Sequence, residues 1–174
     1  MRNKWTRAYR TISSVGIDGD KLVVKFANGN APTVECSTLV PPGVKHIKWH
    51  DASVAFDGSR IVVPSEPSHS EIPWDVIRNL TDETFARQMA KRAAEQARYI
   101  GARLRELRQR RGLTQSKVAS IAGIEPSNLS RIENGRFDLS TSTLWRVLAA
   151  MGHSPRDLAP QGEAHARGAS PGYV

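Results

Sequence analysis

The sequence predicts an α+β protein: a small antiparallel β-domain, then a linking helix, then a five-helix all-α domain. Short β-branched segments separated by Asn-Gly and Asp-Gly turns fill the early part of the 174 residues. A helical period of apolar residues then takes over. Glycine-marked joints finally divide the chain into short helices. We place the β-rich domain at residues 1–80, the linking helix at 81–99, the helical domain at 100–158 and a disordered tail at 159–174.

The strand signals are clearest around three tight turns. Leu22–Phe26 and Thr33–Cys36 flank an Asn-Gly pair at Asn28, which predicts a hairpin. Asp-Gly pairs at Asp18 and Asp57 mark two further turns between apolar segments. We therefore expect a small antiparallel sheet of about four to six short strands.

The chain changes from loop to helix after these strands. Ser, Pro and Glu dominate Ser65–Pro73, which predicts a loop followed by a short helical turn. Thr81 is a good N-cap before two acidic residues. We expect the linking helix to start there and to break near Gly101.

The composition is that of an ordinary globular protein with a basic balance. Hydrophobic residues make up 39%, charged residues 24%, and the net charge is +8. No apolar run approaches the roughly 20 residues that span a bilayer, and no apolar stretch follows the basic N-terminus to make a signal peptide. We expect a cytoplasmic protein without membrane contact. Residues 87–111 hold nine Lys/Arg against two Glu, a net of +7, which favours a polyanionic partner.

The reactive side chains do not form a convincing catalytic or metal site. Cys36 is the single cysteine, so it has no internal disulfide partner, and we interpret it as a strand residue. His46 and His50, next to Asp51, suggest a metal, but on a strand they would lie about 13 Å apart. We interpret them as surface histidines. No Ser/His/Asp arrangement or phosphate-binding glycine loop appears, so we predict no enzyme, no cofactor and no metal.

The glycine-marked joints of the helical domain predict a helix-turn-helix. Thr114 caps one helix, and the next begins at Pro126, where the missing proline N–H would have been unpaired anyway. Only a short turn around Gly123 separates these helices, which is the spacing of a helix-turn-helix. The second helix has short polar or basic residues on its exposed face, and such a helix fits the major groove of DNA.

Three sequence runs together resemble a known family: Leu104–Arg108, Arg111–Gln115 and Leu129–Gly135. They resemble the Cro and phage-repressor (XRE-type) helix-turn-helix family. The first part of the chain resembles a small bacterial β-domain of unassigned function that is sometimes fused to such modules. That second resemblance depends on the strand pattern, the turn at Ala27–Gly29 and the segment Glu71–Arg78.

The family resemblance implies DNA-contacting roles at matching positions. Gln115 matches a glutamine that contacts a phosphate, and we include its neighbour Thr114 in the predicted DNA-binding set. Ser127, Asn128 and Arg131 match positions that reach base edges. Arg131 would suit guanine, and Asn128 would suit adenine.

The resemblance also implies roles around the end of the recognition helix. Asn134 and Arg136 match positions that contact the DNA backbone. Arg108 and Glu133 match a pair that forms an internal salt bridge. Pro126 departs from the pattern, because some relatives place a base-contacting side chain there, whereas proline offers only apolar contact. Direct readout is therefore expected from fewer residues.

These features favour a bacterial-type, sequence-specific, double-stranded DNA-binding transcriptional regulator, acting as a repressor and reading the major groove with the helix at about 126–133. A homodimer is expected, because one short recognition helix reads few base pairs. The β-domain would provide dimerisation or receive a signal. Two alternatives stay open. One is an antitoxin that binds its own operator and neutralises a toxin through the β-domain or the tail. The other is a protein-bridging adaptor.

Overall fold

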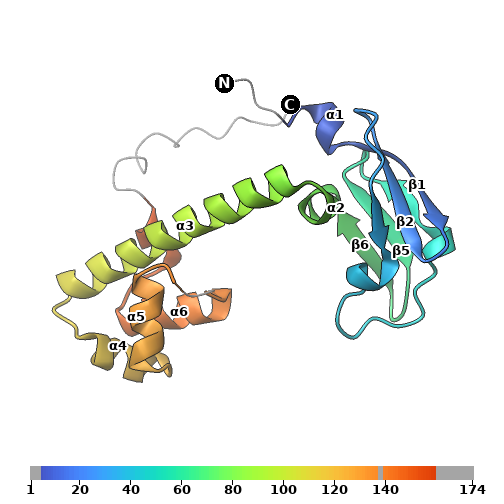
Figure 1. The fold of residues 1–174 in the computed structure, drawn as a ribbon. Coiled ribbons are helices and arrows are strands. Elements are labelled where there is room, and N and C mark those ends of the chain that lie inside the picture. The colour runs from blue at the N-terminus through green and yellow to red at the C-terminus, as the bar shows by residue number, and fades with distance from the viewer. Residues whose placement is uncertain (1–4, 137–138, 160–174) are drawn as a thin grey trace, which may run out of the picture. The chain divides into compact units, whose positions relative to one another are not determined.

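The computed structural model describes residues 5–136 and 139–159 and divides the chain into two compact units, Met1–Met89 and Ala90–Val174. The strands lie in the first unit together with several short helices, and the described part of the second unit is helical (Figure 1). The α+β class predicted from the sequence is thereby confirmed. The residues of the expected disordered tail lie outside the described part of the chain, apart from Ala159.

Two three-stranded antiparallel sheets form the first unit, with strand orders β1-β2-β3 and β4-β5-β6. The strands are β1 (Ile12–Asp18), β2 (Lys21–Phe26), β3 (Thr33–Glu35), β4 (Ser53–Ala55), β5 (Arg60–Pro64) and β6 (His69–Pro73). The predicted hairpins are present: β1 pairs with β2, β2 with β3, and β4 with β5. Alternate residues of β2 are buried, at Leu22, Val24 and Phe26, as the period of a one-faced strand requires.

Several local predictions for this unit are wrong. Part of the expected loop over Ser65–Pro73 is β6, which pairs with β5 from His69 to Pro73. Its alternate residues Ser70 and Ile72 are buried, and Pro73 is tolerated because β6 is an edge strand. Cys36 is not in a strand: it begins the 3₁₀ helix η1 (Cys36–Leu39) and is buried. Two further short helices were not predicted, α1 (Arg7–Arg10) and the 3₁₀ helix η2 (Trp49–Asp51).

The core of the first unit joins both sheets to helix α2 (Trp74–Thr81). Its buried residues are Ile12, Leu22, Val24, Phe26, Val34, Cys36, Leu39, Ile61, Val63, Ile72 and Ile77. A second, aromatic cluster of Trp5, Tyr9 and Phe85 packs against Trp74. These clusters bring the first turn of helix α3 (Glu83–Arg110) onto the first unit.

A buried arginine ties α2 to the sheet. Arg78 is 2% exposed, and its guanidinium lies 3.9 Å from the ring centre of Tyr9 and 3.6 Å from that of Phe26. It donates to the backbone oxygen of Tyr9 at 2.9 Å and to the side-chain oxygens of Asn30 at 2.8 Å and Asn28 at 3.3 Å. These oxygens accept hydrogen bonds from the guanidinium and compensate for the burial of its charge.

The cap of helix α3 is Asp82, one residue later than the expected Thr81. Asp82 accepts a hydrogen bond from the N–H of Phe85 at 3.0 Å. Thr81 ends α2 and donates its hydroxyl to the backbone oxygen of Ile77 at 2.8 Å. The helix then continues to Arg110 without the break expected near Gly101.

No helix among the described residues combines the length and the apolar character that crossing a membrane requires.

The second unit packs three helices and a 3₁₀ turn along the C-terminal part of α3 (Figure 1). They are α4 (Gln115–Ala122), α5 (Pro126–Glu133), α6 (Thr141–Ala150) and η3 (Pro155–Leu158). One apolar core holds them together, with buried residues Leu104, Leu107, Val118, Ala119, Ala122, Leu129, Ile132, Val147, Leu148 and Met151. The helical domain predicted from the glycine-marked joints therefore has the predicted number of helical elements.

Candidate nucleic-acid interface

The turn between α4 and α5 has the geometry of a helix-turn-helix. The hydroxyl of Thr114 accepts a hydrogen bond from the N–H of Lys117 at 3.2 Å and so caps α4. Gly123 ends this helix in the left-handed region, with φ 64° and ψ 42°. Three residues, 123–125, separate the helices, and Pro126 occupies the first turn of α5. The local sequence therefore sets both the end of one helix and the start of the next.

The two sides of α5 differ in exposure. Leu129, Ile132 and Glu133 are buried against the rest of the unit. Ser127 and Arg131 are exposed, and Asn128 is half-buried. The structure thus leaves the predicted base-reading residues on the outer part of the helix, while the inner part anchors it.

Close backbone contact holds the inner side of α5 against α3. A methyl group built on Gly101 of α3 would lie 2.3 Å from the backbone oxygen of Ile132 and 3.0 Å from the carbonyl carbon of Glu133. Only glycine allows this approach. Gly135, with φ 64°, also comes close to α3, because a methyl group there would lie 2.7 Å from the Cα of Arg98. Two glycines therefore set the distance between α3 and the C-terminal end of α5.

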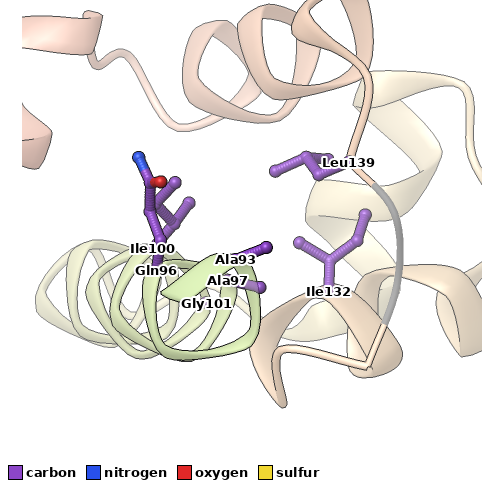
Figure 2. Close-up of a pocket in the computed structure, with 7 residues that line it drawn as sticks. All are labelled: Ala93, Gln96, Ala97, Ile100, Gly101, Ile132 and Leu139. Carbon is purple, nitrogen blue, oxygen red and sulfur yellow. The ribbon is translucent and has the colours of Figure 1, made fainter. Parts of the chain in front are cut away.

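A small apolar hollow opens beside this contact. It has a volume of about 240 Å³, and Figure 2 shows the side chains around it. The lining residues are Ala93, Gln96, Ala97, Ile100, Gly101, Ile132 and Leu139. None of these seven is an acid, a base or a nucleophile, so the hollow offers no group for catalysis.

A buried carboxylate on α5 links this helix to α3 and α4. The side chain of Glu133 is 1% exposed. It accepts hydrogen bonds from Nε and Nη2 of Arg108, at 2.6 and 2.9 Å. Gln115 donates its Nε2 to the same carboxylate at 2.8 Å. Arg108 also donates to the backbone oxygen of Leu113 at 2.8 Å. This arrangement fixes the start of α4 and the end of α5 relative to α3.

The electrostatic balance at Glu133 favours the charged form. Burial alone would raise the pKa of this carboxyl. The hydrogen bonds from Arg108 and Gln115, together with the charges of Arg108 and Arg105, outweigh burial and hold the pKa of Glu133 below its ordinary value of 4.5. The Glu133 carboxylate in turn raises the pKa of the Arg108 guanidinium. Glu133 and Arg108 therefore form a charged, hydrogen-bonded pair inside the unit.

The end of α5 carries contacts that the sequence did not predict. Arg105 donates its Nη2 to Oδ1 of Asn134 at 2.7 Å and lies 3.6 Å from Oε2 of Glu133. Asn134 also donates its Nδ2 to the backbone oxygen of Ser130 at 2.7 Å. Its side chain is thus held within the protein on both sides. Arg136 is exposed, and its N–H donates to the backbone oxygen of Arg131 at 2.9 Å.

The structure gathers the residues singled out from the sequence around α5. Thr114 and Gln115 lie at the start of α4, Ser127, Asn128 and Arg131 on α5, and Asn134 and Arg136 directly after it. His46 and His50, by contrast, do not come together: His46 contacts Glu66 at 2.7 Å, and His50 lies in η2. The described residues contain no group of three or more potential metal ligands.

A short helix that follows a tight turn and exposes polar side chains is the arrangement that enters the major groove of DNA. The second unit is therefore a helix-turn-helix domain.

Comparison with known proteins gives the same class. A family model described as a helix-turn-helix domain matches residues 100–161. The chain is 37% identical over 79 residues to the putative antitoxin HigA2 of Mycobacterium tuberculosis, a match that covers 45% of this chain and 75% of that protein. The chain belongs to the Cro/XRE-type helix-turn-helix family.

Two further matches each cover a smaller share of this chain. The transcriptional regulator RamB of M. tuberculosis is 37% identical over 54 residues, which is 31% of this chain, and the chain spans only 11% of RamB. The crystal structure of the restriction-modification controller protein C.AhdI from Aeromonas hydrophila matches with 31% identity and a TM-score of 0.36. That match covers 37% of this chain and 98% of C.AhdI.

Proposed function

We propose that this protein is a sequence-specific transcriptional regulator that binds double-stranded DNA and acts as a repressor, with α5 in the major groove. The observation that carries the proposal is the division of α5. Its inner side is fixed by Gly101 and Glu133, while Ser127 and Arg131 remain exposed. A rigidly held helix with outward polar groups supports reading of base edges.

The residues of the interface then take distinct roles. Arg131 would donate its planar guanidinium to O6 and N7 of a guanine, and Asn128 would pair with an adenine. Ser127 would contact a base edge near the start of α5. Gln115 uses one amide hydrogen for Glu133, and its second remains for a phosphate.

Phosphate contacts at both ends of the motif complete this interface. Thr114 lies at the start of α4, while Asn134 and Arg136 follow α5. Because Asn134 is bound to Arg105 and Ser130, we assign it the role of holding this end in place for a backbone contact. The Arg108–Glu133 pair is internal and structural.

The remaining parts of the chain fit the same proposal. We propose a homodimer in the cytoplasm, because two recognition helices on one DNA face read a longer site than one helix alone. We keep the division into a β-rich domain (1–80), a linking helix (81–99), a DNA-binding domain (100–158) and a tail (159–174). The β-rich domain would provide dimerisation or receive a signal. We propose no enzyme activity.

Replacing Arg131 with alanine is expected to remove base preference at one position of the bound site. Loss of a bidentate guanine contact costs about 1–3 kcal/mol of discrimination. Selection of bound duplexes from a random DNA pool, run with both proteins, measures this effect. The original protein should select a palindromic motif, and the variant should select a motif that is degenerate at one position in each half.

The matched control for this selection is Arg156→Ala, which removes an exposed arginine of η3. It should select the unchanged motif. Binding that is sensitive to salt but yields no motif with either protein would contradict the specific-regulator proposal. Absence of DNA binding would favour the adaptor.

A second candidate function is that of an antitoxin, and the relation to the putative antitoxin HigA2 favours it. Neutralising a toxin would use the first unit or the tail, while α5 would still bind the operator. The test is to express any small protein encoded by a gene adjacent to that of this chain and to measure growth. Rescue by both the original chain and Arg131→Ala would support an antitoxin whose neutralising surface is separate from α5. Absence of growth arrest, or of rescue, would contradict it.

A further inference from the structure

Two arginines of α3 flank the C-terminal end of α5. Arg98, Gly101 and Arg105 are spaced at i, i+3 and i+7 and therefore share one face of α3. Gly101 brings this face against the backbone of α5, and the Cα of Arg98 lies beside Gly135. Arg105 reaches Asn134 at 2.7 Å. Both arginines therefore lie next to the turn that the proposed function places on the DNA backbone.

Part of the positive charge at this end of α5 remains exposed to solvent. Glu133 is already bound by two nitrogens of Arg108 and by Gln115. Arg105 lies 3.6 Å from that carboxylate, which is too far for a hydrogen bond. The Arg105 side chain is 41% exposed.

Two more arginines extend this positive surface. Arg98 and Arg136 are exposed. No carboxylate of the described residues pairs with either. The acid nearest to Arg98 along the helix, Glu95, lies 3.9 Å from Lys91.

We propose that Arg98, Arg105 and Arg136 form a second DNA contact, made to the phosphates that flank the base pairs read by α5. This inference rests on the proposed function and adds to it a surface on α3 that the helix-turn-helix motif does not include. Guanidinium groups suit this role, because their planar forks bind phosphate oxygens in pairs. The partner is the phosphodiester backbone of a duplex, and no base is read.

A structural role offers a competing explanation for the same residues. Cations near the C-terminal end of a helix interact favourably with its partial negative charge. That role would act on the stability of the free protein and would leave the salt dependence of DNA binding unchanged. The salt dependence therefore separates the two explanations.

The test uses the double variant Arg98→Gln, Arg105→Gln in the full chain. The dissociation constant is measured by fluorescence anisotropy over a salt series, with the selected duplex and with a scrambled one. The slope of log K against log salt should fall by about 1.8, because each lost phosphate contact removes about 0.9. Affinity for both duplexes should fall by a similar factor, and the selected motif should not change.

Three comparisons complete the design. The control Arg110→Gln, Arg156→Gln removes the same charge from α3 and η3 and should keep the original slope. The variant Arg98→Lys, Arg105→Lys keeps the charge and should also keep the original slope. On duplexes trimmed close to the motif, the original protein should bind with lower affinity, whereas the affinity of the glutamine variant should change little.

A slope that is unchanged in the glutamine variant would overturn this inference, even if the variant melts at a lower temperature. An equal fall of slope in the Arg110, Arg156 control would also overturn it, because net charge alone would then explain the effect. If the original protein selects no motif while the slope still falls only in the Arg98, Arg105 variant, the phosphate surface stands and the specific-regulator proposal fails.

Discussion

Replacing Arg108 with methionine should destabilise the second unit by about 3–5 kcal/mol, because it leaves a buried carboxylate without its main partner. Glu133 has a side chain that is 1% exposed and relies on Arg108 for two of its hydrogen bonds. Hydrogen exchange of the Leu129 and Ile132 amides, followed by NMR in the full chain, reports the stability of this unit separately. Both amides should exchange faster by a factor of a hundred or more, which corresponds to about 3 kcal/mol.

An exposed ion pair on the same helix provides the control. Arg110 pairs with Glu106 in the part of α3 that belongs to the second unit, and their side chains are 53% and 43% exposed. Arg110→Met should change the free energy of unfolding of the second unit only slightly, because an exposed ion pair contributes little to stability. If Arg108→Met changed it equally little, the buried pair would not be what holds α5 in place.

The Glu133 carboxylate makes the stability of the second unit depend on pH in the acid range. The pKa of Glu133 is lower in the folded protein than its ordinary value of 4.5. The stabilisation from the charged form is therefore complete above pH 4.5 and is lost as pH falls through the folded pKa. Glu133→Gln cannot titrate at this position. The protection of its Leu129 and Ile132 amides, which is the intrinsic exchange rate divided by the measured rate at the same pH, should therefore depend less on pH in this range. An identical pH profile in both proteins would assign the acid sensitivity to other groups.

The second large effect is expected at Gly101. Gly101→Leu should destabilise the second unit by about 3 kcal/mol or more, because the added side chain has to displace the backbone of α5. Its Cβ would lie 2.3 Å from the backbone oxygen of Ile132. In an exposed helix interior the same change would be favourable, since leucine is a much better helix former than glycine.

The matched control is Gln109→Leu at an exposed position of the same helix, where the unfolding free energy should change little. Exchange of the amides in α5 and the affinity for the selected duplex are the two readouts. The Gly101 variant should lose both together, because the recognition helix can no longer dock on α3. A variant with unchanged exchange would show that α5 relaxes around the leucine without cost.

The sequence predicted those parts of the fold that depend on local signals. The Asn-Gly turn at Asn28 and the Asp-Gly turns at Asp18 and Asp57 define hairpins whose partners are adjacent in the chain. Strand β6 was missed, because Ser, Glu and Pro within it resemble a loop and its stability comes from pairing with β5. The continuity of α3 was missed for a related reason: Gly101 weakens a helix locally but permits a packing contact across the unit.

In the candidate site too, some contacts could be predicted from the sequence and others could not. The family resemblance placed Arg108 opposite Glu133, and the two side chains form an ion pair in the structure. The contacts of Gln115 with Glu133 and of Arg105 with Asn134 join residues on different helices. No sequence spacing indicates such contacts. The DNA-contacting roles of the exposed residues remain predictions.

The separation between the anchored and the exposed sides of α5 has a consequence for changing what the protein recognises. Ser127 and Arg131 contribute nothing to the apolar core, whose α5 members are Leu129 and Ile132. Substitutions at the two exposed positions should therefore be tolerated by the fold in large combinatorial sets. Under the proposed function, new target sequences would become accessible through a few surface changes, while the scaffold behind α5 stays constant.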